Sequence, residues 1–180
     1  MTNSEPRPPS GQIQLLAYES RWRTLFLEER DQLQASIGEY VLDIQHIGST
    51  SIPGMPAKPI LDIGIAITNF EAGIRCIQPM EKLRYTYKGE NGIPLRHYFV
   101  KGFPRTHHVH MVELESEDWK SYLLFRDYLI KNPETARSYE RLKQRLAKQF
   151  VTERAAYQAG KDSFIKAVLY KAREGDRTGA

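Results

Sequence analysis

The sequence predicts an α/β (α+β) fold, in which a mixed β-sheet is flanked by helices and followed by a C-terminal helical tail. Residues 40–114 contain short apolar or alternating runs separated by Gly, Pro and Asn, a pattern typical of strands joined by turns. After Ser116 the apolar residues recur at helical spacing only. A hydrophobic content of 41% in 180 residues is enough for one domain with a buried core.

We expect one folded domain over residues 15–173. Residues 1–14 are rich in Pro and Ser and lack an apolar core, which predicts a disordered lead-in and no secretory signal. Residues 174–180 are polar, and we expect a frayed tail there. No apolar run approaches the roughly 20 residues that span a bilayer, and the single cysteine, Cys76, fits a reducing compartment. The expected location is therefore cytoplasmic, without a membrane partner.

The first elements follow from the spacing of apolar residues. This spacing predicts an amphipathic helix over residues 17–36, and Gly38 marks its end. Residues 40–47 alternate and are rich in β-branched side chains, which indicates a strand. Residues 59–68 are more continuously apolar, which favours a strand covered on both faces.

The later elements alternate less regularly before the helical tail begins. A helix interrupted by proline is expected over residues 71–83, and short strands are expected over 85–88, 95–101 and 106–114. Ser116 is predicted to cap a helix over residues 118–131. Pro133 suits the first turn of the next helix, and Gly160 is predicted to separate that helix from the last one.

The loop between the first two predicted strands has the composition of an anion site. Gly48 and Ser49 are small enough for backbone N–H groups to approach an anion closely, as in a phosphate-binding nest. Lys58 lies near this turn, so its ammonium group could neutralise phosphate charge. Asp62 is the one carboxylate in the next apolar run, where a hard cation could bridge it to the phosphate.

Further polar residues are weaker candidates for ligand contacts. Thr50 and Ser51 offer hydroxyl and N–H groups to a phosphate, or they cap a short helix inside the loop. His46 either contacts a ligand or ties the loop down, and the sequence leaves both interpretations open. Arg96 and Arg105 are additional candidates for binding phosphate or carboxylate.

The sequence also resembles a known family. His46-Ile-Gly-Ser-Thr-Ser-Ile-Pro-Gly54 and Ala57-Lys-Pro-Ile-Leu-Asp-Ile63 are similar to the signature of the GrpB family. Further matches continue the resemblance from about residue 18 to residue 172, among them His108-Val-His110, Phe125-Arg-Asp-Tyr-Leu129, Asn132-Pro133, Tyr139, Leu142-Lys143, Tyr157 and Lys161-Asp-Ser-Phe-Ile165. That family is grouped by fold with the nucleotidyltransferases related to DNA polymerase β, so the resemblance implies a nucleotidyltransferase-like mixed sheet.

The resemblance also implies where metal would be held, with one departure. Nucleotidyltransferases supply two acids separated by one residue on the strand after the Gly-Ser turn, but here Gly64 follows Asp62 at that distance. His108 and His110 are two residues apart and face the same side of a strand, so they could complete a site for Mg, Mn or Zn with Asp62. Alternatively, the histidines donate hydrogen bonds to a phosphate or to the sheet edge. Glu113 is expected on the opposite face.

Two functions remain open at this stage. The first is a nucleotidyltransferase-like, metal-dependent enzyme that acts on a nucleotide or another phosphorylated small molecule, with Asp62, Lys58 and His110 as catalytic residues. ATP or another nucleoside triphosphate is a candidate cofactor. The alternative is a non-catalytic nucleotide- or phosphate-binding module that regulates a partner.

The charge distribution and the family matches in the helical tail give less information about function than the loop residues do. Basic residues outnumber acidic ones after residue 118, within a net charge of +4, but their helical spacing is typical of solvated helix faces, so we do not expect a nucleic-acid partner. A homodimer remains open. The roles of Arg126, Lys143, Tyr157 and Lys161 are ligand contact or packing, and the sequence does not decide between them.

Overall fold

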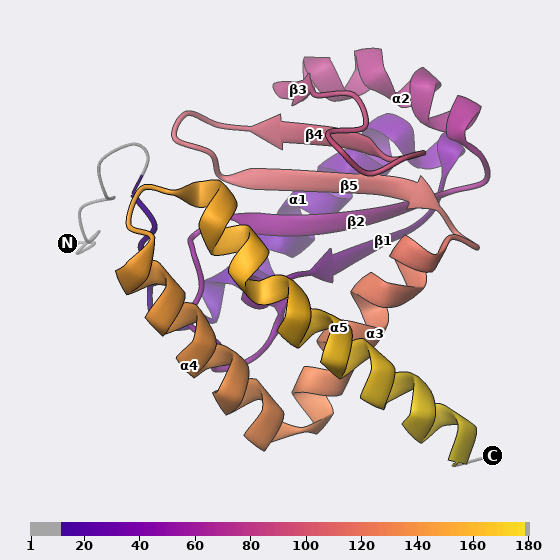
Figure 1. The fold of residues 1–180 in the computed structure, drawn as a ribbon. Helices are drawn as coiled ribbons and strands as arrows, with labels where there is room; N and C mark the ends of the chain where they lie inside the picture. Colours follow the sequence, from indigo (N-terminus) through magenta and orange to yellow (C-terminus); the bar gives the residue numbers. More distant parts are fainter. Residues whose placement is uncertain (1–11, 179–180) are drawn as a thin grey trace.

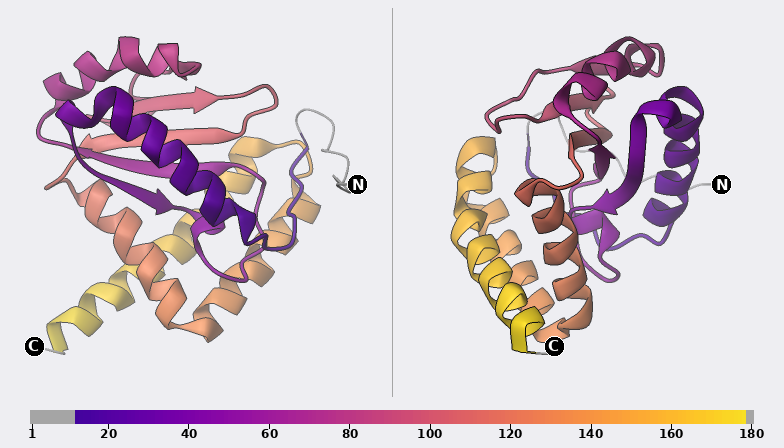
Figure 2. Two further views of the ribbon diagram at one scale, coloured as in Figure 1. Left: turned by 180° about the vertical axis from the view of Figure 1, so that it is seen from behind. Right: turned by 90° about the vertical axis from the view of Figure 1, so that its right-hand side faces the viewer.

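The structure is a computed structural model that describes residues 12–178. A five-stranded mixed sheet forms its centre. Helices α1 (Arg21–Ile37) and α2 (Phe70–Lys82) pack on one face, and α3 (Glu117–Lys131), α4 (Pro133–Gln149) and α5 (Arg154–Thr178) lie on the other side (Figures 1 and 2). The predicted sheet flanked by helices, with a helical tail, is confirmed at this level.

The strand order places the second and fifth strands side by side at the centre of the sheet. The strands are β1 (Val41–Ile47), β2 (Leu61–Ile67), β3 (Tyr85–Tyr87), β4 (His97–Lys101) and β5 (His107–Glu113), in the order β1-β2-β5-β4-β3. Strands β2 and β5 are parallel and pair Asp62 with His108 and Gly64 with His110. The other neighbouring pairs are antiparallel. Side chains two residues apart share a face, so this register brings Asp62 and both histidines to one face.

The opposite face of the sheet carries the main hydrophobic core. Ile63 and Ile65 of β2 are fully buried there, against Phe26 and Leu33 of α1. The helix expected from residue 17 begins only at Arg21, and Gly38 follows its last residue as predicted. The strand expected from residue 95 begins at His97, because Leu95 adopts a positive φ of 61° that extended backbone does not use.

The helical layer follows the predicted punctuation except at one glycine. The Ser116 hydroxyl accepts a hydrogen bond from Trp119 N and caps α3, and Pro133 is the first residue of α4. Gly160, however, lies inside α5 and does not separate two helices. A Cβ atom at Gly160 would lie 2.5 Å from a methyl group of Leu146, so this glycine permits α5 to approach α4 closely.

Both ends of the described chain differ from the expected domain limits. Residues 1–11 of the expected lead-in lie outside the described residues, but Ile13 is buried, and its N–H donates to Val151 O. Leu16 forms an isolated bridge with Ala57. Because Ile13 is already buried, packing begins before residue 15. Helix α5 continues to Thr178, which places residues 174–178 in a helix, while residues 179–180 lie outside the described part. No helix within residues 12–178 is long and apolar enough to cross a membrane.

A buried ion pair joins α1 to the sheet on the core face. Glu29 is 5% exposed, and its carboxylate accepts hydrogen bonds from Lys101 Nζ at 2.8 and 2.9 Å and from the Tyr85 hydroxyl at 2.8 Å. His107 Nε2 lies 3.8 Å from the same carboxylate. The negative charge is therefore fully partnered, and it compensates the partly buried lysine.

We predict that Glu29→Ala lowers the free energy of unfolding by about 2–4 kcal/mol, because it leaves the Lys101 ammonium group without its carboxylate. Urea unfolding followed by circular dichroism measures the change. The matched control is Glu28→Ala, at the preceding exposed position, which should stay within about 0.5 kcal/mol of the parent chain. Equal effects of the two substitutions would contradict the role of the buried pair.

Candidate functional site

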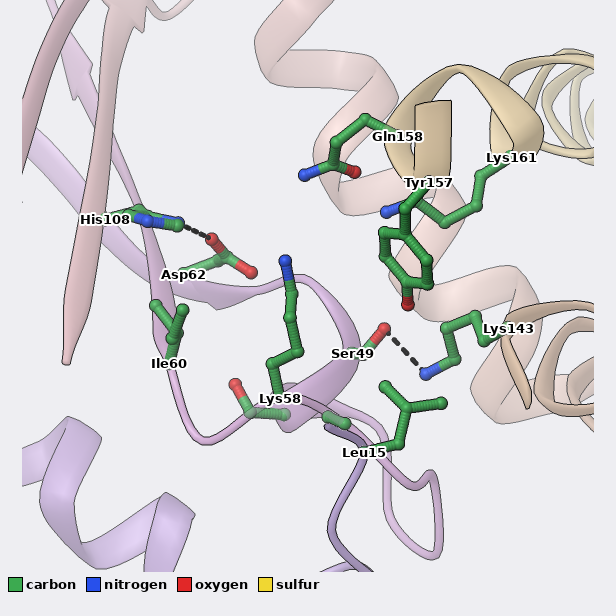
Figure 3. A pocket seen from close by; sticks show the side chains of 12 residues that line it. Leu15, Ser49, Lys58, Ile60, Asp62, His108, Lys143, Tyr157, Gln158 and Lys161 are labelled. Atoms are coloured by element: carbon green, nitrogen blue, oxygen red, sulfur yellow. Dashed lines mark hydrogen bonds and ion pairs between the residues drawn. The ribbon is translucent and has the colours of Figure 1, made fainter. Parts of the chain in front are cut away.

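A cleft opens on the face of the sheet that carries α3, α4 and α5. Its volume is about 70 Å³. It lies between the N-terminal end of β2, the loop before that strand and the two last helices (Figure 3). The polar side chains that line it are Ser49, Thr50, Lys58, Asp62, His108, Lys143, Tyr157, Gln158 and Lys161. Sequence segments more than a hundred residues apart therefore meet in one cleft.

The turn after β1 touches the strand carboxylate directly. Gly48 has a φ of 70°, and a Cβ atom there would lie only 2.5 Å from Asp62 Oδ2. Both the backbone conformation and the contact require glycine. Ser49–Ser51 then form a short 3₁₀ turn, η2. The predicted proximity of the Gly-Ser turn to Asp62 is confirmed.

Two histidines hold the Asp62 carboxylate. His108 Nδ1 lies 3.0 Å from Asp62 Oδ1, and His110 Nε2 lies 3.7 Å from the same oxygen. Burial alone would raise the pKa of the Asp62 carboxyl, but hydrogen bonds and positive charge from the two rings hold this pKa well below its usual range. Burial lowers the pKa of His110, and Arg96 lies 3.2 Å from its Nδ1. The carboxylate is therefore ionised, with His110 Nε2 facing it.

This arrangement differs from the predicted metal site. The same-face placement of Asp62, His108 and His110 is confirmed, and Glu113 lies on the opposite face, where it accepts a hydrogen bond from Phe70 N. However, both rings turn toward the carboxylate and not toward a common empty position. In residues 12–178, no group of three or more His, Cys, Asp or Glu side chains is placed to hold a metal ion. Metal binding by these three side chains therefore stays a prediction.

The structure explains why a second acid is missing at Gly64. A Cβ atom at this position would lie 3.1 Å from the Trp119 ring and 3.3 Å from Ile47. Trp119 is buried in one cluster with Ala66 and Val112, so a side chain at Gly64 would have to displace a packed ring. Helix α3 thus packs directly on the backbone at Gly64.

His46 is not part of the cleft. It is paired with Ile63 in the sheet and therefore lies on the core face, opposite Asp62. Its ring stacks on Phe26 at 4.7 Å between ring centroids, and its Nε2 lies 2.9 Å from Thr50 Oγ1. Burial lowers the pKa of His46 to about 4, so the ring is neutral. Of the two roles left open, the structure favours tying the loop down.

The remaining predicted contacts divide between loop and cleft. The Ser51 hydroxyl donates to Gly48 O at 2.6 Å and Thr50 contacts His46, so these hydroxyls stabilise the turn itself. Arg96 is 5% exposed and donates to the carbonyl groups of Glu90 and Asn91 besides contacting His110, so it supports the wall beside the histidines. Arg105 is exposed and does not line the cleft.

Three lysines give the cleft its excess positive charge. Burial, reinforced by neighbouring cations, lowers the pKa of Lys58 to about 8 and that of Lys143 to about 7, and burial lowers the pKa of Lys161. The ammonium groups of Lys58 and Lys161 lie 5.3 and 4.8 Å from the centroid of the Tyr157 ring. Lys58 points from the loop toward Asp62 (Figure 3). A bound anion would relieve this repulsion.

The sequence did contain a signal for Lys143. It lies on the same helical stripe as Tyr139 and Leu146, which are both buried, and this spacing is the signal, although the sequence left ligand contact and packing both open for Lys143. It is 2% exposed, and its ammonium group donates to Ser49 Oγ at 3.0 Å and to Pro56 O. By contrast, Arg126 pairs with Asp127 and donates to Gln45 Oε1 and His46 O, and it does not line the cleft.

Comparison with known proteins gives one consistent result. The family model described as GrpB protein matches residues 12–171. The UPF0157 protein YqkA of Bacillus subtilis is 43% identical over 159 residues, which are 88% of this chain and 46% of that protein. The chain thus spans about half the length of YqkA. The glutamate-rich protein GrpB of Alkalihalophilus pseudofirmus is 33% identical over 88% of this chain and 95% of that protein.

A solved structure gives the same result for the fold. The crystal structure of the conserved protein GrpB from Enterococcus faecalis superimposes with a TM-score of 0.84 at 35% identity, over 90% of this chain and 98% of that one. The mixed sheet with its helical tail is therefore an architecture that this chain shares with that protein.

We predict that Gly64→Asp does not install a usable second acid but lowers the free energy of unfolding by about 2 kcal/mol or more. The new carboxylate would enter the contact with Trp119, where it has no partner. Urea unfolding measures the change, with Thr86→Asp at an exposed strand position as the control. An unchanged urea midpoint for Gly64→Asp would contradict the prediction, because it would show that α3 moves away and makes room for the new side chain.

We also predict that Lys143 makes the stability of the free protein rise with pH. In the unfolded chain lysine keeps its proton up to about pH 10.5, whereas folded Lys143 loses it near pH 7, so folding releases a proton between these values. The free energy of unfolding should therefore increase by about 1.6 kcal/mol from pH 7 to 8.5 through this group. Urea titrations at both pH values should show a smaller increase in Lys143→Met than in the control Lys148→Met, which changes an exposed lysine of α4. Identical pH dependence in the two variants would contradict the prediction.

Proposed function

This chain belongs to the GrpB family, and we propose that it is a nucleotidyltransferase-like enzyme that acts on a nucleotide or another phosphorylated small molecule. One observation carries the proposal: the Gly48 turn touches Asp62 on one side of a cleft whose other side presents Lys58, Lys143 and Lys161. The cleft therefore combines a surplus of positive charge with a single, ionised carboxylate.

The proposed ligand group is a phosphate seated between the turn and the lysines. Phosphate oxygens accept hydrogen bonds from ammonium groups and from backbone N–H groups at the start of η2. Burial is the main cause of the lowered pKa values of Lys58 and Lys143, and a phosphate dianion would counter both this burial and the repulsion from neighbouring cations that adds to it. Binding would then return protons to these lysines, so the free energy of binding depends on pH.

The size of the cleft agrees with a phosphate group. A water molecule needs about 10–15 Å³ of a volume measured in this way, so about 70 Å³ holds roughly five non-hydrogen atoms. A phosphate group fits this space, whereas a nucleoside does not. In the proposed complex the remainder of the ligand extends out of the mouth of the cleft.

Asp62 is the proposed partner of a divalent cation. Mg²⁺ commonly binds one or two carboxylates together with phosphate oxygens and water, and Asp62 with a bound phosphate offers that donor set. When bound, such a cation neutralises charge on the phosphate oxygens. Lys58 offsets developing charge from the loop side. His110 and His108 orient the carboxylate and keep it ionised.

A binding module without catalytic activity is the second candidate. Trp119 occupies the space of a second acid, and the two histidines already contact Asp62 Oδ1, which favours a site that holds a ligand without transferring a group. In this function the same phosphate site would regulate a partner.

We predict that phosphate, pyrophosphate or a nucleoside triphosphate raises the melting temperature at pH 6.5 and does so much less at pH 9, where Lys143 and Lys58 have lost their protons. Thermal unfolding with and without Mg²⁺, Mn²⁺ or Zn²⁺ measures this shift. Lys161→Met should abolish it, whereas Lys166→Met, at an exposed position of α5, should retain it. A shift that is independent of pH and unchanged in Lys161→Met would overturn the phosphate site.

Asp62→Asn separates the two functions on the same samples. Loss of phosphate or pyrophosphate release from a nucleoside triphosphate panel, with the thermal shift retained, supports the enzyme. Ligand binding that is independent of metal and of Asp62, with no turnover by the parent chain, supports the binding module.

A further inference from the structure

We propose that Ser49 is a nucleophile activated by Lys143, and that its hydroxyl oxygen forms a covalent bond with the phosphorus atom of the bound ligand. The choice of phosphorus as the electrophile rests on the proposed function. The nucleophilic pair itself rests on the geometry of α4 and η2.

The first observation is the contact between the two side chains. Lys143 Nζ lies 3.0 Å from Ser49 Oγ, within the range in which a base can take a hydroxyl proton. Both residues line the cleft, so a group bound there has access to Ser49 Oγ. Figure 3 shows this pair at the wall opposite His108 and Asp62.

The second observation is the environment of the Lys143 ammonium group. It is 2% exposed, and it forms no ion pair with a carboxylate of residues 12–173. The charged and titratable groups that face it are Lys58 from the loop, Asp62 from β2, Tyr139 and Glu140 from α4, and Tyr157 and Lys161 from α5. Burial, together with the positive charges of Lys161 and Lys58, outweighs the negative charges of Glu140 and Asp62 and lowers the pKa of Lys143 to about 7.

The third observation is the orientation of the amine. Lys143 Nζ also donates to Pro56 O, a backbone carbonyl group that holds the amine from the loop side. In its neutral form the amine can donate to Pro56 O while its lone pair accepts the Ser49 hydroxyl proton. A lysine that only neutralised phosphate would not need to contact a serine hydroxyl in this way.

The chemical step balances without a further reactant. Lys143 takes the hydroxyl proton, Ser49 Oγ forms a bond to phosphorus, and the bond from phosphorus to the leaving group breaks, with its electron pair going to that group. The proton then passes from Lys143 to the leaving group or to water. In the second step an acceptor hydroxyl attacks phosphorus, and the bond between phosphorus and Ser49 Oγ breaks with its electron pair going to Oγ. Lys143 takes the acceptor's proton and transfers it to Ser49 Oγ, which regenerates the serine.

This route removes the need for the second acid. Direct transfer between two substrates commonly uses two metal ions, which clamp the attacking and the leaving oxygen. In a covalent route, a lysine activates each attacking oxygen in turn. The contact of Trp119 with Gly64, which leaves no room for a second acid, is then compatible with group transfer.

Diisopropyl fluorophosphate tests the nucleophile directly, because attack by serine forms an oxygen–phosphorus bond and expels fluoride. We expect one diisopropylphosphoryl group per chain by intact mass, mapped to Ser49 by peptide mass spectrometry. The labelling rate should increase with pH around a midpoint near 7, as Lys143 loses its proton. Labelling elsewhere, or a rate without a midpoint between pH 6 and 8, would overturn the inference and needs no variant.

Variants identify the base. Lys143→Arg keeps the positive charge but cannot accept a proton, and it should slow labelling at least about 100-fold, whereas Lys148→Arg should label like the parent chain. Ser49→Ala should not label. Absence of labelling while phosphate still raises the melting temperature would overturn the nucleophile and leave the phosphate site intact. Labelling at Ser49 without any phosphate-induced shift would instead overturn the phosphate site.

Discussion

The contact between Gly48 and Asp62 is the constraint on which the rest of the site depends. The missing side chain at Gly48 lets the turn close over the carboxylate, and the parallel pairing of β2 with β5 supplies the histidines that keep this carboxylate ionised. The same turn also positions the start of η2 beside α4. A side chain of any size at Gly48 would separate these parts, because the strand behind Asp62 is fully packed.

The two faces of the sheet treat buried charge in opposite ways. On the core face, Glu29 and Lys101 compensate each other and are fully hydrogen-bonded, an arrangement that serves structure. On the other face, Lys58, Lys143 and Lys161 line a cleft in which Asp62 is the one carboxylate among the described lining residues. Burying these lysines in their charged form costs free energy of folding. Such unbalanced buried charge is typical of functional sites.

Much of this arrangement could be predicted from the sequence, because strands obey a period of two. The alternation around His108 and His110 predicted that both lie on one face of the sheet. The apolar run around Asp62 predicted that this residue lies in a strand of the sheet. Pairing register is not written in a single strand, so the side on which His46 falls could not be fixed. Likewise, Gly160 is a packing contact between helices and has the same local pattern as a helix end. The lysines of α4 and α5 reach the cleft only through tertiary packing.

The site is also assembled from parts that become available at different times. The turn and the strand carboxylate come from residues 48–62, whereas Lys143 and Lys161 lie on the last two helices. During synthesis the residues of the sheet leave the ribosome before those of α4 and α5, since a chain is made from its N-terminus. A nascent chain would then carry Asp62, Lys58 and the turn before Lys143 and Lys161 have docked, so the proposed anion site would be completed only in the last stage of folding.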